Sequence, residues 1–201
     1  KTAYEISLGL VGSEMCIRDR ASMAPWVTSR IYDRLNKFGQ KIENDVDIIL
    51  FSGGGDPDTA FHIGKILNRM TEGNLTYIIP RYAASAATLL ALSGNKILMG
   101  PPSELSPIDP QIEVSPNRFV SAHSVRESFN LIFEAIIQHP ELPKTTVEAL
   151  LEKLPITEVV DYDRLLDHTE ELAFLLLKLR MIKDESKAKE IANKLVRGYK
   201  H

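Results

Sequence analysis

The sequence has very little cysteine, no long hydrophobic run and no excess of charge of either sign. Its single cysteine, Cys16, cannot form an internal disulfide or a cysteine metal cluster. No apolar run approaches the roughly 20 residues that span a bilayer. Lys and Arg number 24 against 27 Asp and Glu, so the net charge of −3 argues against general nucleic-acid binding. We therefore expect a soluble, cytoplasmic protein with no membrane segment, metal site or nucleic-acid partner.

What is present is the composition of an ordinary globular protein. Apolar residues make up 44% and charged residues 25% of the 201 residues, which excludes an intrinsically disordered chain. A chain of this length can bury a core without disulfides or a structural metal.

The first 20 residues are poorly suited to a folded domain. Residues 1–6 and 10–19 resemble, position by position, the conceptual translation of a common short-read sequencing-library adapter with a variable barcode between them. The alternative is a short strand, because Ile6, Leu8 and Leu10 alternate with other residues. We expect residues 1–20, Cys16 included, to be foreign to the natural protein, and the natural chain to be truncated at both ends.

From residue 21 onward, short apolar runs alternate with helical patterns. The spacing predicts buried strands over residues 46–51, 75–79 and 96–99, and helices over residues 25–38, 58–70 and 84–92. This alternation favours an α/β layer with parallel strands. Further helices are predicted over residues 121–139, 144–154, 160–182 and 186–196. We expect one domain over residues 21–201, with an α/β core over about 21–120 and a helical part over about 121–201.

Three glycines follow the first predicted strand, at residues 53–55. Glycines at this place let backbone N–H groups turn toward a ligand, and the N-terminus of the next helix adds a positive dipole. The pattern indicates an anion or oxyanion site, with a plain tight turn as the alternative. It is not a phosphate-binding loop, because no Gly-Lys-Ser/Thr follows.

Ser85 comes after the second predicted strand, at the start of the helix expected over residues 84–92. A helix N-terminus stabilises negative charge that develops on the hydroxyl or on a bound carbonyl oxygen. The alternative is that Ser85 only caps the helix, an interaction worth roughly 1 kcal/mol.

The segments DIILFSGGGDPDTAFHIGKIL, IPRYAASAAT and KILMGPPSELSPIDPQI together resemble the Clp-protease/crotonase superfold. Within it they are similar to the serine dehydrogenase proteinase family, relatives of the signal peptide peptidase A type of serine peptidases. The resemblance covers about 65 residues, 47–111. It implies an oligomeric serine peptidase without a cofactor, which acts on peptides or proteins. Some relatives have a membrane anchor, so membrane association of the full-length protein through a segment before residue 21 stays open.

The same resemblance implies roles for individual residues. Ser85 would be the nucleophile, and Gly54, Gly55 and the N–H of Ala86 would form the oxyanion hole. Residues 103–111 would shape the floor of the site, with Asp109 as the acidic group nearest Ser85.

A serine nucleophile needs a nearby base, and the sequence leaves this base open. His123, in the first turn of the helix predicted over residues 121–139, is the best candidate. The alternative is an exposed histidine in a helix that Ser121 and Ser124 cap. Arg126 lies close in sequence but stays charged, so it cannot accept the proton.

Two departures from the family pattern keep other functions open. Ala84 stands where the family often has lysine, and Ala87 where it often has glycine. A non-catalytic pseudo-peptidase that serves in assembly or peptide binding is therefore one alternative. A crotonase-type acyl-CoA enzyme is another, although no basic group is placed for the nucleotide phosphates.

Overall fold

The computed structural model describes residues 7–11, 14–18, 22–37, 41–115, 118–152 and 156–198. The chain divides into two compact units. The first comprises Lys1–Ile108 and Glu170–His201, and the second is Asp109–Thr169.

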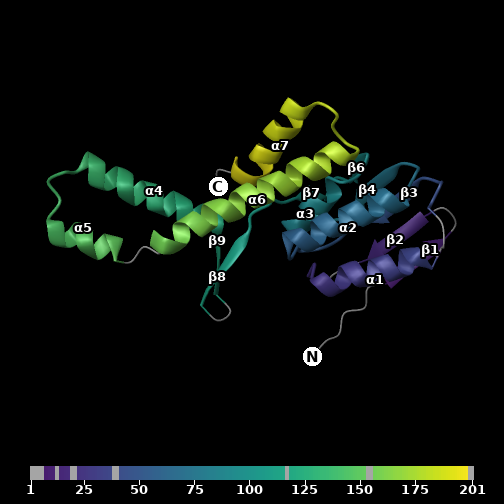
Figure 1. The fold of residues 1–201 in the computed structure, drawn as a ribbon, viewed down its shortest axis with the longest axis horizontal. Coiled ribbons are helices and arrows are strands. Elements are labelled where there is room, and N and C mark those ends of the chain that lie inside the picture. Colours follow the sequence, from purple (N-terminus) through teal and green to yellow (C-terminus); the bar gives the residue numbers. More distant parts are fainter. Residues whose placement is uncertain are drawn as a thin grey trace. The chain divides into compact units, whose positions relative to one another are not determined.

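A parallel three-stranded sheet forms the centre of the first unit. Its strands are β3 (Val46–Ile49), β4 (Leu75–Ile79) and β6 (Lys96–Met99), in the order β3-β4-β6. Helix α2 (Pro57–Met70) connects β3 to β4, and α3 (Ala86–Ala91) lies between β4 and β6 in the chain (Figure 1). The predicted α/β class with parallel strands is confirmed. The first strand ends at Ile49, two residues earlier than predicted.

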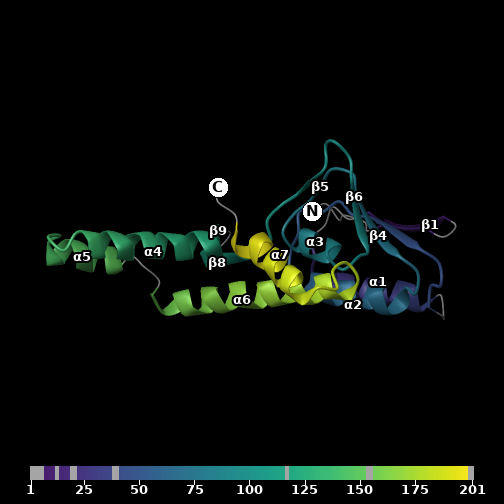
Figure 2. The same ribbon diagram turned by 90° about the horizontal axis from the view of Figure 1, so that it is seen from above.

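One face of this sheet packs against helices. Alternate strand residues are fully buried, since Ile48 in β3 and Tyr77 in β4 have no exposed surface. Figure 2 shows α1 (Pro25–Asn36) and α2 together on one side of the strands. Helix α1 turns Val27, Ile31 and Leu35 inward, at the spacing of four residues that places side chains on one helix face.

A second pairing of short strands sets the position of Ser85. Strand β5 (Tyr82–Ala83) pairs in parallel with β7 (Glu104–Leu105), and Ala83 also forms a bridge with Ser52. Because residues 82–83 are extended, α3 begins at Ala86 rather than at the predicted residue 84. The loop that carries the glycines and the segment that carries Ser85 therefore run side by side.

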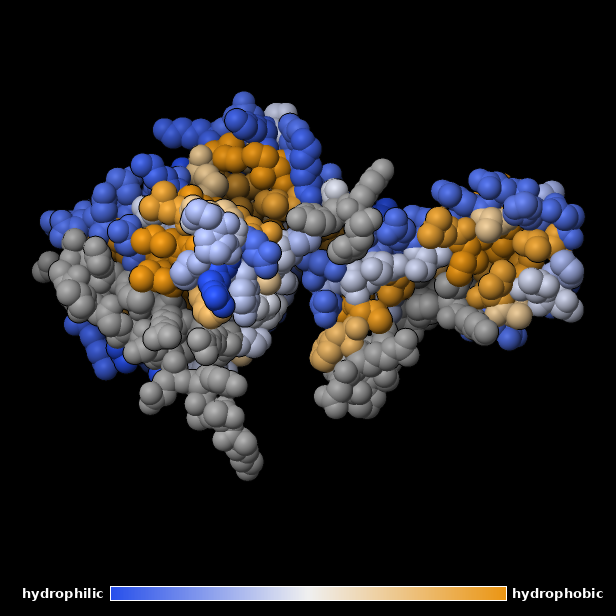
Figure 3. Space-filling view, turned by 180° about the vertical axis from the view of Figure 1, so that it is seen from behind, coloured by the Kyte–Doolittle hydropathy of each residue, from blue (hydrophilic) through white to orange (hydrophobic). Residues whose placement is uncertain are grey.

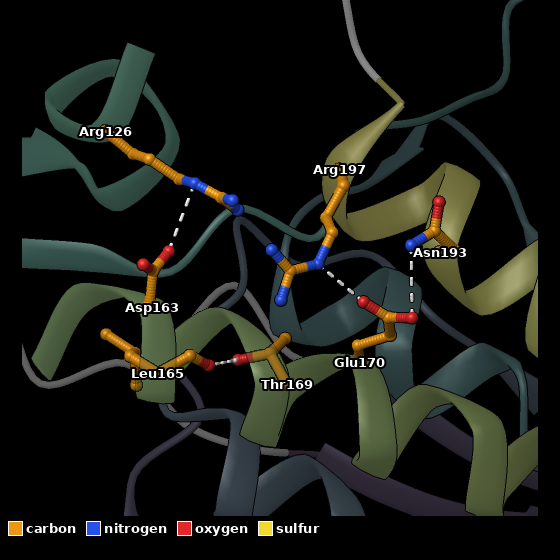
Figure 4. Close-up of polar contacts among 7 residues, drawn as sticks. All are labelled: Arg126, Asp163, Leu165, Thr169, Glu170, Asn193 and Arg197. Carbon is orange, nitrogen blue, oxygen red and sulfur yellow. Dashed lines mark hydrogen bonds and ion pairs between the residues drawn. The ribbon is translucent and has the colours of Figure 1, made fainter. Parts of the chain in front are cut away.

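Two arginines hold the C-terminal helices in place within the first unit. Arg180, just after α6 (Ile156–Leu179), donates hydrogen bonds to Asn68, Thr71, Gly73 and Asn95. In α7 (Glu185–Arg197), Arg197 pairs with Glu170 of α6 at 2.6 Å (Figure 4).

The second unit is a short hairpin followed by helices. Strands β8 (Gln111–Ser115) and β9 (Arg118–Ser121) are antiparallel and precede α4 (Ala122–Gln138) and α5 (Lys144–Leu151). The first part of α6 also belongs here, and Arg126 of α4 pairs with its Asp163 at 3.1 Å (Figure 4). Apolar atoms are exposed over α4 and α5 (Figure 3), and the large exposed side chains of α4 are Leu131, Phe133 and Ile137. The helices predicted after residue 120 are confirmed, with shifted ends.

Near the N-terminus, β1 (Ser7–Val11) and β2 (Glu14–Arg18) form an antiparallel hairpin. The rest of the segment predicted to be foreign, residues 1–6, 12–13 and 19–20, lies outside the described residues. Among the helices that the structure describes, none combines the length and the apolar content that a membrane crossing requires.

Candidate active site

Ser85 has a backbone conformation that L-amino acids rarely adopt. Its φ is +51° and its ψ is −117°, and it is the one non-glycine residue with positive φ in the described part of the chain. It precedes α3 at the N-cap position, yet its side chain makes no capping hydrogen bond. The explanation of Ser85 as a simple helix cap is therefore wrong. Backbone strain of this kind costs about 1–3 kcal/mol and clusters at functional sites.

The glycine loop lies directly against Ser85. Gly54 and Gly55 have φ of +98° and +145°. A Cβ atom on Gly54 would lie 2.9 Å from the Cβ of Ser85 and 3.1 Å from the backbone N of Ala86. Glycine is required at Gly54 both by its backbone conformation and by this close approach. The first of the three, Gly53, has nothing within 4 Å of the equivalent position.

The N–H groups around Ser85 differ in their partners. The N–H of Gly54 donates to Ser52 Oγ at 3.2 Å. Those of Gly55 and Ala86 donate to no acceptor among the residues that the structure describes. An N–H group with no acceptor among these residues is the kind of donor that an oxyanion needs, and Ala86 directly follows the half-buried Ser85.

At the glycine loop, the N-terminus of α2 carries a negative charge beside the predicted helix dipole. Asp56 is the N-cap of α2, and its carboxylate accepts hydrogen bonds from the N–H and the hydroxyl of Thr59, at 2.8 Å and 2.5 Å. This negative charge lies where the positive end of the helix dipole would act on an anion. Helix α3 has only six residues, so its dipole adds little.

Hydrogen bonds from three segments hold the residues around Ser85. Ser52 accepts from the N–H of Ala84 at 3.0 Å through its carbonyl oxygen. Ser106 accepts from the N–H of Ser85 at 2.7 Å through its hydroxyl. The fully buried Thr88 hydroxyl lies 2.7 Å from the carbonyl oxygen of Ala83 and 2.9 Å from that of Ser106. Sequence reasoning missed Ser52 and Ser106, because isolated serines carry no local signal of a contact made across the fold.

The predicted base and the predicted acidic group belong to the second unit. His123 lies in the first turn of α4, where Ser121 caps the helix by accepting from the N–H of Ser124 at 3.0 Å. Its imidazole is half-buried, with Nδ1 3.8 Å from Glu127. Asp109 has one buried carboxylate oxygen that accepts no hydrogen bond from the residues described. Ser85, Gly54, Gly55 and Ala86 are thus brought together within the first unit.

The described part of the chain contains no cluster of three or more His, Cys, Asp or Glu side chains that could hold a metal ion.

Comparison with protein families finds one match over most of the chain. A family model described as ClpP-like SDH-type serine proteinase matches residues 39–201, which include the whole candidate site. Two curated relatives, both from Methanocaldococcus jannaschii, are uncharacterized proteins. MJ1495 is 30% identical over 154 residues, which cover 76% of this chain and 44% of that protein. MJ0137 is 36% identical over 70 residues, which cover 35% of this chain and 24% of that protein. The chain thus spans less than half the length of these relatives.

Two solved structures illustrate the likeness of this chain to known folds. A substrate-peptide complex of the 1510-N membrane-bound stomatin-specific protease is 15% identical, with a TM-score of 0.43, over 91% of this chain and 70% of that one. The ClpP protease catalytic domain from Plasmodium falciparum is 20% identical, with a TM-score of 0.33, over 39% of this chain and 50% of that one.

Proposed function

The chain belongs to the ClpP-like SDH-type serine proteinase family, and on that premise we propose that it hydrolyses peptide bonds by acyl transfer through Ser85. Family membership supports a peptidase-type function. The assignment of the nucleophile has its own support, the strained backbone of Ser85 beside the close-packed Gly54.

The proposed reaction begins with attack of Ser85 Oγ on the carbonyl carbon of a peptide bond. The new C–O bond forms as the carbonyl π electrons move onto oxygen, and the hydroxyl proton passes to a base. The N–H groups of Gly55 and Ala86 would donate to the oxyanion, an interaction typically worth about 3 kcal/mol per donor. Gly54 would complete the hole by allowing the loop to approach Ser85.

Collapse of the tetrahedral intermediate then breaks the C–N bond. The amine leaves with the proton that the base returns, and water hydrolyses the ester on Ser85 by the same steps in reverse order. We propose His123 as the base and Asp109 as a supporting group. The proposed substrate is a peptide or a protein, and the proposed working state is a homo-oligomer.

Irreversible labelling tests the assignment of Ser85. A fluorophosphonate phosphonylates an activated serine: the new O–P bond forms as fluoride leaves and the hydroxyl proton passes to a base. The adduct is located by mass spectrometry of the peptides. We expect an adduct on Ser85 that is absent from the Ser85→Ala variant. The control is Ser128→Ala, because Ser128 is an exposed serine of α4 whose hydroxyl donates to the carbonyl oxygen of Ser124.

The labelling experiment and a thermal-unfolding experiment with coenzyme A separate the alternatives. A folded protein without an adduct would contradict catalysis by Ser85 and favour the pseudo-peptidase. Thermal stabilisation by coenzyme A would instead favour an acyl-CoA site, because a ligand that binds only the folded state raises the melting temperature.

A further inference from the structure

Ser106 contacts the backbone of the proposed nucleophile. It follows β7, and its own N–H donates to the carbonyl oxygen of Ala83 at 3.1 Å. Its hydroxyl accepts from the N–H of Ser85 at 2.7 Å and donates to the carbonyl oxygen of Pro107 at 2.9 Å. Both functions of the hydroxyl are therefore used, and its orientation is fixed.

The peptide unit between Ala84 and Ser85 is held at both ends. Its carbonyl oxygen accepts from the N–H of Ala87 at 2.9 Å, and its N–H donates to Ser106. Among the residues that the structure describes, only one end of the next peptide unit has a partner: the carbonyl oxygen of Ser85 accepts from the N–H of Leu89 at 3.1 Å. The N–H at its other end, that of Ala86, is the proposed oxyanion donor.

Loss of the Ser106 hydroxyl would release this arrangement. The N–H of Ser85 would lose its acceptor, and the unfavourable φ of +51° would be free to relax toward ordinary values. Rotation about the N–Cα bond of Ser85 moves its hydroxyl and the Ala86 N–H together, relative to the Ala84–Ser85 peptide unit and to Gly54, which approaches Ser85 closely. The proposed reaction requires both groups to keep their place beside the glycine loop.

We propose that Ser106 is a positioning residue. Its hydroxyl holds Ser85 in the strained conformation by accepting a hydrogen bond from the Ser85 N–H. This proposal rests on the proposed function of Ser85. Ser106 does not itself touch the substrate, so its loss is expected to change the rate of the chemical step more than the affinity for a ligand.

The test compares substitutions of Ser106 in saturation kinetics with a fluorophosphonate. Ser106→Ala is expected to lower the maximal inactivation rate by roughly ten- to a hundredfold, the range for a small misplacement of reacting groups. The concentration for half-maximal rate is expected to stay within about threefold. Ser106→Thr keeps the hydroxyl and restores the rate, and Ser106→Cys, a weak acceptor, gives an intermediate rate.

Ser128→Ala is the control, because it removes an exposed serine hydroxyl, which donates to the carbonyl oxygen of Ser124 in α4, and does not touch Ser85. If Ser106→Ala does not fold, the test compares the maximal inactivation rates of the wild type, Ser106→Thr and Ser106→Cys. Equal rates across the Ser106 series, with a labelled wild type, would overturn the role of Ser106 alone. A folded wild type that is never labelled would overturn the function of Ser85, and the role of Ser106 with it.

Discussion

Substitution of Gly54 by alanine tests the packing on which the candidate site depends. The new Cβ would lie 2.5 Å from the carbonyl oxygen of Ala84 and 2.9 Å from the Cβ of Ser85, and the backbone φ would stay at +98°. The first atom belongs to the backbone, so the overlap cannot be relieved by turning a side chain. Overpacking costs about 1–3 kcal/mol and left-handed backbone in an L-residue about 1–2 kcal/mol.

These effects together lower the free energy of unfolding by roughly 2–5 kcal/mol, which is roughly 5–20 °C in melting temperature for a protein of this size. The overlap also pushes Ser85 away from the glycine loop, so labelling by a fluorophosphonate is expected to fall by at least about tenfold. Both quantities are measured on one preparation, by thermal unfolding followed by circular dichroism and by the rate of adduct formation.

Gly53→Ala provides the matched control. Nothing lies within 4 Å of its added Cβ, so we expect a change in stability within about 0.5 kcal/mol. Gly54→Ala and Gly53→Ala variants with equal melting temperatures and equal labelling rates would refute the account of the loop.

Three further predictions concern other parts of the molecule. Arg180→Ala removes the hydrogen bonds that hold the end of α6 to the core, so we expect the free energy of urea unfolding to fall by at least about 2 kcal/mol. The control, Arg164→Ala, breaks an exposed ion pair with Asp161 and is expected to change this free energy by less than about 0.5 kcal/mol. A hydrogen bond from the N–H of Asn74 lowers the pKa of Asp45 below its ordinary 3.8. The ionised carboxylate therefore stabilises the fold above pH 3.8, and this stabilisation is lost as the pH falls through the lowered pKa. Asp45→Asn is expected to flatten the loss of melting temperature between about pH 5 and pH 2. His123→Ala lowers the rate of Ser85 labelling by roughly 10²- to 10⁴-fold, while replacement of His139, an exposed histidine elsewhere in the same unit, leaves it unchanged.

Local patterns in the sequence predicted the sheet well. The runs over residues 75–79 and 96–99 form strands with those bounds, and the helices of the C-terminal part are present. These elements bury apolar residues at a regular spacing, which is visible in a single segment. Strands β8 and β9 were missed, although Ile112, Val114 and Phe119 show part of an alternating pattern on either side of Pro116.

The conformation at Ser85 could not be predicted in the same way. Alanines on both sides of the serine favour a helix, so the pattern placed the helix start at residue 84. The structure instead extends residues 82–83 to pair with β7, more than 20 residues later in the chain. Long-range pairing overrides local propensity here, and it produces both the strained Ser85 and its contact with Ser106.

The function proposed for Ser85 is tested most directly by relating peptide hydrolysis to modification of that residue. The protein is treated with a fluorophosphonate for increasing times. At each time, hydrolysis of a fluorogenic peptide is measured, together with the fraction of chains that carry an adduct on Ser85. Activity is expected to fall linearly with that fraction and to reach zero at one adduct per chain. Hydrolysis that persists when every Ser85 is modified would contradict its role as the nucleophile.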